Sequence, residues 1–394
     1  MFKQIKTGFT AMPKFLILFG NTTLLSKLEF EATYPNCSLE QLDEHLFMFE
    51  SEATLASEMI EVLGGTVKLF EVIKELDSDI KDTTLVEEIV ALLLSQSEEP
   101  YFTFTQIGKG QHSISNADIK DLIKENGKKA RYFSSNPSES ALLSHKSKAT
   151  ELLAFNQIED GKLLLAQIRG VQDIDDWTNR DRSKPYADRK KGMLPPKVAR
   201  MMVNIALGLW QQKNTAKPLL YDPFCGTGTV LLEAGMRKLD VYGSDIDQQA
   251  VFGTRDNLEW FKKEYEINIS SKVFYMDASH INPEEFTSKI DLLVTEPFLG
   301  KQTPKDIELA NVFKGLEKMY LGSFKSFSNV LNNGAIVAIV FPRVQTDKRI
   351  YSLDSLIDKL KAKGYNLLVD PVIYAREGAR VARQICLFSF DRQI

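Results

Sequence analysis

The sequence predicts an α/β protein whose carboxyl-terminal half is a doubly wound, largely parallel sheet. From Leu194 onward, seven strand-like runs alternate with helical segments, which is the pattern of parallel strands joined by crossovers. The 394-residue chain is 43% apolar and 26% charged, an ordinary globular composition with enough length for two or three cores. We expect the strands at 219–223, 240–245, 271–277, 291–297, 334–342, 366–374 and 384–390.

A helix should precede the first of these strands. The stretch 194–210 has prolines in its first turn, and its apolar residues recur at helical spacing, which predicts one buried face. That face consists of Val198, Met201, Met202, Ile205 and Leu209.

The front half reads as two smaller regions. After a disordered extension of eleven residues, strand-like runs alternate with helical periodicity up to residue 100, which again predicts an α/β region. The next region combines strands with a helix at 116–129 and a connecting helical element at 138–155, whereas 171–192 is charged, lacks apolar periodicity and predicts a linker or extended arm. The expected domains are 1–100, 101–170, the linker 171–192, and 193–394.

Charge is segregated along the chain. Residues 1–100 carry 7 Lys and Arg against 18 Asp and Glu (7 − 18 = −11), and residues 101–200 carry 18 against 12 (18 − 12 = +6). Any contact with a polyanion should therefore involve the middle of the chain. The alternative, that these charges form solvated helix faces, stays open.

The cysteines and histidines suggest neither a disulfide framework nor a metal site. Cys37, Cys225 and Cys386 lie far apart, and the four histidines are scattered, so we expect no metal and a reducing, cytoplasmic location. No run approaches the roughly 20 apolar residues of a membrane span.

Each of the first four predicted strands has an acidic residue at its carboxyl end, as its last or second-last residue. These residues are Asp222, Asp245, Asp277 and Glu296. In an open parallel sheet, ligands bind beyond the carboxyl ends of the strands, so the four side chains should share one rim.

The loop DPFCGTGT after the first strand contains Gly226 and Gly228, which allow a tight turn and a close approach to a ligand. The helix beginning near Thr229 would present unpaired amides to an anion. A phosphate-binding Walker loop needs Gly-Lys-Ser/Thr, which is absent, and a dinucleotide fingerprint needs a third glycine where Leu231 stands. The acidic Asp222 instead suits a ligand with a cationic group beside an anionic one, such as the amino-acid end of S-adenosylmethionine.

The second and third acidic residues, Asp245 and Asp277, are suited to the ribose and the adenine of such a ligand. Asp245 follows Asp222 by 23 positions (245 − 222), the spacing at which a carboxylate accepts both ribose hydroxyls. Asp277 could accept the adenine amino group beside the backbone of Ala278. Each acid alone is equally well explained as a helix cap or turn carboxylate, whereas their order on successive strands is more specific.

Glu296, in the stretch TEPFLG, lies where a methyl acceptor would bind. The lone pair of an exocyclic base amine is delocalised into the ring, so it needs acceptors for its two protons. The Glu296 carboxylate and the Pro297 carbonyl can serve, and Phe298 can stack on an extruded base. The alternative is a buried strand end with a capping glutamate.

These residues resemble class I S-adenosylmethionine-dependent methyltransferases with a Rossmann-like seven-stranded fold, in particular the branch that modifies amino groups. Its signatures are DPFCGTG and a later Asp/Asn-Pro-Pro-Tyr/Phe. The resemblance assigns a cofactor site and implies an acceptor site at Glu296, Pro297 and Phe298. TEPFLG departs from the second signature, with Glu for Asp or Asn and a single proline. The cofactor residues are Asp222, Phe224, Gly226, Gly228, Asp245, Ile246, Asp277 and Ala278.

Stretches in and just after the front half of the chain make the resemblance more specific. The stretches LGGTVKLFEVI, ESALLSHK, RDRSKP and GMLPPKVARMMVNIAL look like tRNA guanine-N2 methyltransferases of the archaeal and eukaryotic type. That family implies a ferredoxin-like and a THUMP RNA-binding region before the catalytic domain, tRNA as the substrate, and N2-methylguanosine, with position ten of the tRNA as the leading target. Whether a small activator protein takes part stays open, and the sequence gives no oligomeric state.

Two basic clusters are candidate RNA contacts. Arg182 and Lys184 lie on the predicted arm, and Arg376 and Arg380 lie between the sixth and seventh strands, where the sixth opens on the catalytic edge. An ordinary solvated hairpin with Gly378 in its turn explains the second cluster equally well.

Three hypotheses remain. The first is a methyltransferase that acts on a guanine amino group in tRNA. The second is a DNA adenine-N6 or cytosine-N4 methyltransferase, although no target-recognition insertion interrupts the catalytic half. The third is an RNA-binding module that has lost turnover through TEPFLG.

Overall fold

The computed structural model describes residues 12–110, 112–133, 149–157, 160–188, 193–301, 303–376 and 378–392. The chain divides into two units. Unit 1 holds the described residues up to Thr23, with Pro35–Val62 and Thr66–Ile174, and unit 2 holds Leu24–Tyr34, Leu63–Gly65 and the described residues from Asp175 onward.

Unit 1 is built on one eight-stranded sheet in the order β2-β3-β1-β4-β8-β7-β5-β6. The antiparallel pairing of β4 with β8 joins the regions that the sequence suggests as separate domains, so both contribute to the same sheet. Its strands are β1 (Lys14–Phe19), β2 (Glu40–Gln41), β3 (Leu46–Glu50), β4 (Thr66–Asp77), β5 (Tyr101–Gly108), β6 (Arg131–Tyr132), β7 (Thr150–Gln157) and β8 (Lys162–Val171).

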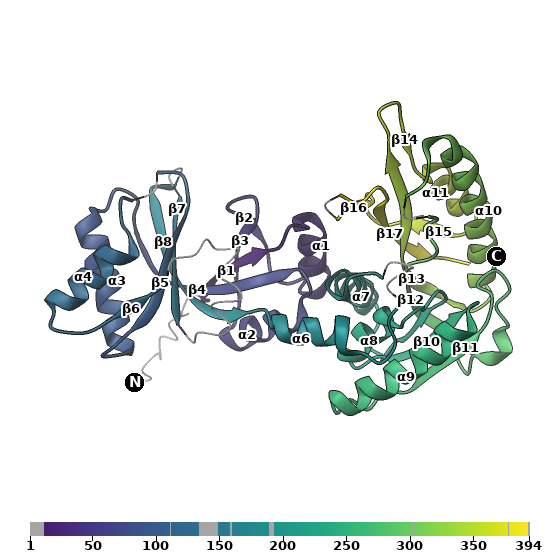
Figure 1. Cartoon of the computed structure of the whole chain (residues 1–394), viewed down its shortest axis with the longest axis horizontal. Coiled ribbons are helices and arrows are strands. Elements are labelled where there is room, and N and C mark those ends of the chain that lie inside the picture. The colour runs from purple at the N-terminus through teal and green to yellow at the C-terminus, as the bar shows by residue number, and fades with distance from the viewer. Residues whose placement is uncertain are drawn as a thin grey trace, which may run out of the picture. The chain divides into compact units, whose positions relative to one another are not determined.

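Helices cover this sheet because its strands are apolar. α3 (Asp82–Gln96) and α4 (Asn116–Glu125) pack together against β5, β7 and β8, as Figure 1 shows, while α2 (Ala53–Val62) contacts β4 and β8. The expectation of a helical element over 138–155 is wrong from Thr150 onward, where β7 forms. A short apolar run such as ELLAF does not distinguish a buried strand from a buried helix. Residues 134–148, with the ESALLSHK motif, and residues 1–11 lie outside the described residues.

Unit 2 contains the predicted doubly wound sheet, in the order β11-β10-β9-β12-β13-β17-β15. The strands from β9 to β13 pair in parallel, and β17 is antiparallel to β13 and β15. The sixth predicted strand is divided into β15 and β16, which both pair with β17. The strands are β9 (Leu219–Asp222), β10 (Asp240–Asp245), β11 (Ser271–Tyr275), β12 (Ile290–Thr295), β13 (Leu331–Gln345), β14 (Ile350–Tyr351), β15 (Tyr365–Leu367), β16 (Val372–Tyr374) and β17 (Ala382–Phe390).

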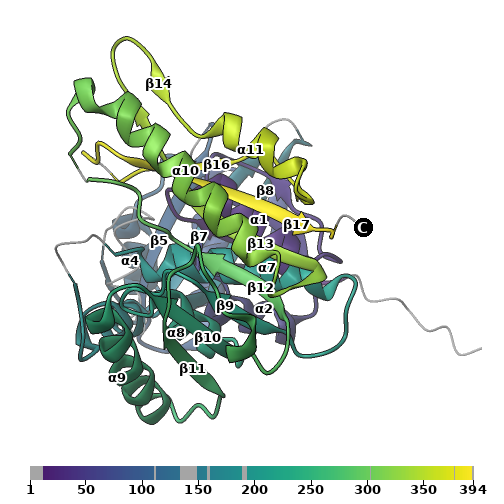
Figure 2. The ribbon, with the colours of Figure 1, turned by 90° about the vertical axis from the view of Figure 1, so that its right-hand side faces the viewer.

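Alternate residues of these strands face two helical layers. On β13, Ile336 and Val340 belong to the core under α7, α8 and α9, whereas Val337 and Phe341 belong to the core under α10 and α11. Figure 2 shows these helices around the sheet. Their bounds are α7 (Pro196–Gln211), α8 (Thr229–Met236), α9 (Gln248–Glu264), α10 (Leu309–Phe327) and α11 (Asp354–Lys361).

The predicted helix at 194–210 is confirmed as α7, but it is buried on all sides rather than on one face. One reason is α1 (Thr23–Thr33), which belongs to unit 2 and packs on it. A Cβ added at Gly208 would lie 2.1 Å from the Ala32 carbonyl oxygen, so only glycine permits this approach.

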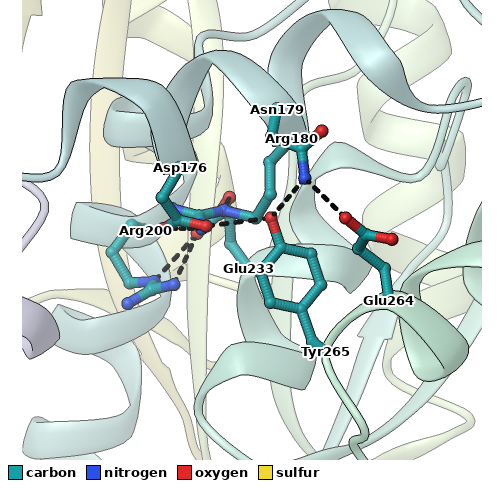
Figure 3. A network of polar contacts seen from close by, with 7 residues as sticks. All are labelled: Asp176, Asn179, Arg180, Arg200, Glu233, Glu264 and Tyr265. Carbon is teal, nitrogen blue, oxygen red and sulfur yellow. Dashed lines mark hydrogen bonds and ion pairs between the residues drawn. The ribbon is translucent and has the colours of Figure 1, made fainter.

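The segment that the sequence suggests as an extended arm is helical over its first part. α6 (Ile174–Thr178) continues into a π-helical turn, Asn179–Ser183. Figure 3 shows what holds it: Arg180 Nε donates to Glu233 of α8 at 2.8 Å, and Arg200 of α7 donates to the other Glu233 oxygen at 2.9 Å. Arg180 also pairs with Asp176. Removing one member of such a buried ionic network is costly, so the segment is fixed to α7 and α8.

Candidate active site

Asp222, Asp245, Asp277 and Glu296 all line one pocket of about 920 Å³ in unit 2. Asp222 and Asp245 are the last residues of β9 and β10, and Glu296 directly follows β12. Asp277 follows β11 by two residues (277 − 275). Because these four strands are parallel, their carboxyl ends meet at one edge, as the strand pattern of the sequence predicts.

The glycine loop forms the floor of this pocket between β9 and α8. Gly226 and Gly228 have φ values of +52° and +79°, in the region that favours glycine. The Gly228 amide donates to the Cys225 carbonyl at 2.6 Å, and the Gly226 amide donates to Asp245 Oδ2 at 2.9 Å. Asn257 of α9 donates to the Thr227 carbonyl at 2.8 Å. The loop is therefore a hydrogen-bonded turn that neighbouring strands and helices hold in place.

Asp222 is 2% exposed and has two protein donors. The Thr295 hydroxyl donates to its Oδ1 at 2.6 Å, and the Phe224 amide donates to the same oxygen at 3.1 Å. Burial raises the pKa of Asp222 to about 7, with help from the charges of Asp245 and Glu296. A cationic group in the pocket would favour the ionised form.

The two carboxylates expected to bind the nucleoside, those of Asp245 and Asp277, differ in their surroundings. Asp245 accepts the Gly226 and Asp247 amides, each at 2.9 Å and each on a different oxygen, which fixes the carboxylate plane. Burial acts to raise the pKa of Asp277, but hydrogen bonds from His280 and the Ser279 amide outweigh it, so the pKa is lowered. The lowered pKa of Asp277 favours its anionic form, which can accept ligand donors.

Apolar surface lies beside these carboxylates. Ile246 is 66% exposed although it is a large apolar residue, and it lines the pocket with Phe224 and Ala278. Such surface suits the flat faces of a nucleoside.

At the acceptor position, Glu296 is held by an arginine from another strand. Arg383 of β17 donates through Nε to Glu296 Oε1, and its Nη2 lies 3.3 Å from Oε2. Burial raises the pKa of Glu296, and Arg383 limits the rise. Pro297 is buried, while Phe298 is 62% exposed with its carbonyl held by the Tyr320 hydroxyl at 2.8 Å.

The predicted RNA contacts differ in their exposure and in their partners. Arg376 is exposed at the pocket and donates to the Met193 carbonyl at 3.2 Å, and Arg380 pairs with Asp306. Arg182 is exposed on the π-helical turn. Lys184 is only 4% exposed, so its expected place on an exposed arm is wrong. The helical packing of 174–183 turns this side chain inward.

Several residues of the site could not be identified from the sequence. Thr295 and Tyr320 hold the loops, and Tyr186 and Asp188 line the pocket. Arg383 can be identified only once the direction of β17 is known. Because β17 is antiparallel, an arginine near its start lies at the catalytic edge.

Two kinds of feature are absent from the described part of the chain. No group of three or more His, Cys, Asp or Glu residues could hold a metal ion there. Among the same residues, no helix is long and apolar enough to cross a membrane.

Comparison with known proteins gives relatives for this half of the chain. Residues 185–365 match the family described as UPF0020: RMKL-like, methyltransferase domain. The tRNA (guanine(10)-N2)-dimethyltransferase of Methanothermobacter thermautotrophicus is 34% identical over 168 residues, which cover 43% of this chain and 42% of that protein. The protein of the same name from Pyrococcus abyssi is 36% identical over 130 residues, or 32% of this chain and 35% of that one.

These alignments span less than half of either curated relative. The crystal structure of TrmN from Thermus thermophilus has a similar fold, with a TM-score of 0.56 at 15% identity over 96% of this chain and 99% of that one. The fold is thus that of class I Rossmann-like methyltransferases, and residues 185–365 are similar to the methyltransferase domain that the UPF0020, RMKL-like family model describes.

Proposed function

We propose that this protein is an S-adenosylmethionine-dependent methyltransferase that modifies the exocyclic N2 amine of a guanosine in tRNA. The observation that carries this proposal is the single pocket into which four successive strands deliver acidic residues. The names of the relatives support the same substrate class.

The residues present fit the cofactor, which supplies an electrophilic methyl group on a positively charged sulfur. Two backbone amides fix the plane of the Asp245 carboxylate, which can accept hydrogen bonds from both ribose hydroxyls. Asp277 can accept the adenine amino group, with Ile246 and Ala278 against the base. Asp222 can pair with the α-ammonium group, because a buried carboxylate favours a cationic partner.

Glu296 and the loop after it would receive the target base. The Glu296 carboxylate and the Pro297 carbonyl accept the two amine protons, which directs the nitrogen lone pair at the methyl group. The Phe298 carbonyl is already bonded to Tyr320, so the loop position is fixed while the exposed Phe298 ring can stack on guanine. Arg376 at the same pocket can contact a flanking phosphate.

Unit 1 would bind the RNA away from the reacting base. Around the end of α4 its surface carries five exposed basic residues, with the exposed acids Asp121 and Glu125 between them, and an excess of positive charge attracts phosphates. The basic residues are Lys120, Lys124, Lys128, Lys129 and Arg131. The three free cysteines fit a reducing, cytoplasmic location.

Labelled methyl groups test the proposal. Transfer from S-adenosylmethionine is measured into unmodified tRNA transcripts, into transcripts with single guanosine substitutions, and into duplex DNA, with nucleoside mass spectrometry of the products. We expect N2-methylguanosine in the tRNA and loss of the product when one guanosine is replaced.

Other outcomes point elsewhere. Methyl incorporation into DNA alone would show an amino-methyltransferase of DNA. Tight tRNA binding without incorporation into any substrate would show an inactive binding module. A Lys124→Glu, Lys129→Glu variant should weaken tRNA binding and leave cofactor binding unchanged, which tests unit 1 separately.

A further inference from the structure

Lys184 lies behind the glycine loop, directly after the π-helical turn Asn179–Ser183. Its side chain is 4% exposed, and its Nζ donates to Thr229 Oγ1 at 3.0 Å and to Thr227 Oγ1 at 3.2 Å. Thr227 and Thr229 themselves line the pocket. The ammonium group is therefore separated from the pocket by two hydroxyl groups.

Within the described part of the chain, this buried cation has no close counter-ion. Among the described residues, no carboxylate oxygen lies within the 4.0 Å of an ion pair with Lys184 Nζ. Asp181 and Glu233 act on it from farther away, and Glu233 already binds Arg180 and Arg200. A buried charge is costly unless it is paired, so an anion held nearby would be favourable.

The wall in front of Lys184 is suited to such an anion. Thr229 is the first residue of α8, where backbone amides and the helix dipole already give a positive potential. Because Lys184 donates to both hydroxyl oxygens, the hydroxyl hydrogens must point away from it. Thr227 Oγ1 has two further neighbours at 3.4 Å, Met193 Sδ and Thr229 Oγ1, which leaves both hydroxyls available to a better acceptor.

We propose that Lys184 is a positioning residue for the methyl donor: it holds Thr227 and Thr229 so that their hydroxyls and the first amides of α8 receive the donor's carboxylate. This inference rests on the proposed function, and it gives the amino-acid end of the donor two opposite partners. Asp222 would bind the ammonium group, and the Lys184 cluster would bind the carboxylate. Burial lowers the pKa of Lys184 to about 8, so the cluster is fully charged only below that pH.

Two ligands that differ only at the amino-acid end provide the test. S-adenosylhomocysteine carries the carboxylate, and 5′-methylthioadenosine has the same adenosine and thioether without it. In calorimetry, Lys184→Met should bind S-adenosylhomocysteine at least tenfold more weakly than wild type does. Its affinity for 5′-methylthioadenosine should stay within twofold of the wild-type value. Lys197→Met is the matched control, because burial also lowers the pKa of Lys197 to about 8, but the Lys197 Nζ lies over the Trp177 ring, 5.8 Å from the ring centre.

Proton uptake gives a readout that a purely structural role would not change. Near pH 8, binding of S-adenosylhomocysteine to wild type should take up a fraction of a proton as Lys184 becomes fully charged. Titrations in buffers of different ionisation enthalpy measure this uptake. The difference between wild type and Lys184→Met cancels protons that come from the ligand or from Asp222, and 5′-methylthioadenosine should show no such difference.

The outcomes separate the inference from the proposed function. Equal weakening of both ligands, or of neither, would overturn the role of Lys184. If Lys184→Met does not fold, Thr229→Val carries the same test, since it removes one of the two hydroxyls and keeps the lysine. Failure of wild type to bind either ligand would refute the cofactor site itself.

Discussion

Arg383 and Glu296 form an ion pair inside the pocket, although they are 87 positions apart. Each side chain is 12% exposed. Arg383 reaches Glu296 because β17 starts at the edge of the sheet where β12 ends. The Arg383 guanidinium also lies 6.0 Å from the centre of the Tyr374 ring. A fork-shaped donor on both carboxylate oxygens fixes the orientation of Glu296 and favours its charged form.

The first prediction concerns this pair. In Arg383→Gln, the pKa of Glu296 should rise further, because burial continues to act and the opposing charge is lost. Loss of a close opposite charge typically shifts a carboxyl pKa by about 1 to 3 units. The acid limb of the rate against pH should move upward by that amount, measured in single-turnover methyl transfer between pH 5 and 9.

Two comparisons define this result. Arg383→Lys keeps the charge and should restore the position of the acid limb, though not the full rate. Arg392→Gln removes an exposed arginine outside the pocket and should leave the profile as in wild type. An unshifted profile in Arg383→Gln would show that Glu296 does not set the acid limb.

The second prediction tests Glu296 as the proton acceptor. Glu296→Gln removes the charge while keeping the shape, so transfer should slow by about 100-fold, in the usual range for lost acid–base assistance. Binding of S-adenosylhomocysteine and of tRNA, measured by calorimetry and filter binding, should stay within about twofold. Full activity of this variant would place the catalytic step elsewhere.

Much of unit 2 follows from local sequence. Strand-like runs alternating with helical segments predict the sheet, and a glycine loop followed by an acid on each successive strand predicts the pocket rim. These features depend on short stretches whose period and turn chemistry determine the local structure. Asp222 and Asp245 lie where that reasoning puts them because strand direction alone fixes the edge.

Features that depend on distant packing could not be predicted in this way. The charged stretch around Arg180 looks like a solvated linker until Glu233 and Arg200 supply partners for it, and these lie on other helices. Lys184 is turned inward by the same packing. The Arg383 pair requires knowledge that the last strand is antiparallel, and β7 requires knowledge of which apolar run lies inside a sheet.

The third prediction isolates the contact of Asp245 with the ribose. Asp245→Ala also removes the acceptor of the Gly226 amide, so a simple loss of affinity would be ambiguous. Adenosine and 2′,3′-dideoxyadenosine resolve this in a double comparison. Wild type should prefer adenosine by about tenfold or more, as expected for hydrogen bonds to a charged group, and Asp245→Ala should lose most of that preference. An equal preference in both proteins would rule out the ribose role, whatever happens to the overall affinity.

The fourth prediction links function to stability through Asp222. Its pKa is raised to about 7 by burial, and an unfolded aspartate titrates near 4. Between these values the folded state binds more protons than the unfolded state, so this group makes the protein less stable as the pH rises from about 4 to about 7. Above pH 7 the penalty is fully present, with an upper limit of about 4 kcal/mol for a shift of about three units.

Asp222→Asn removes that penalty while keeping an oxygen for the Thr295 hydroxyl. At pH 8 the variant should therefore unfold at a higher temperature than wild type, and the difference should shrink towards pH 5, as followed by circular dichroism. Asp256→Asn on the exposed side of α9 is the control and should match wild type at both pH values. The stabilised variant should also bind S-adenosylhomocysteine more weakly, because the ammonium group loses its anionic partner. If Asp222→Asn were the less stable protein at pH 8, native contacts would already favour the ionised carboxylate, and the pocket would not need a cationic ligand to charge it.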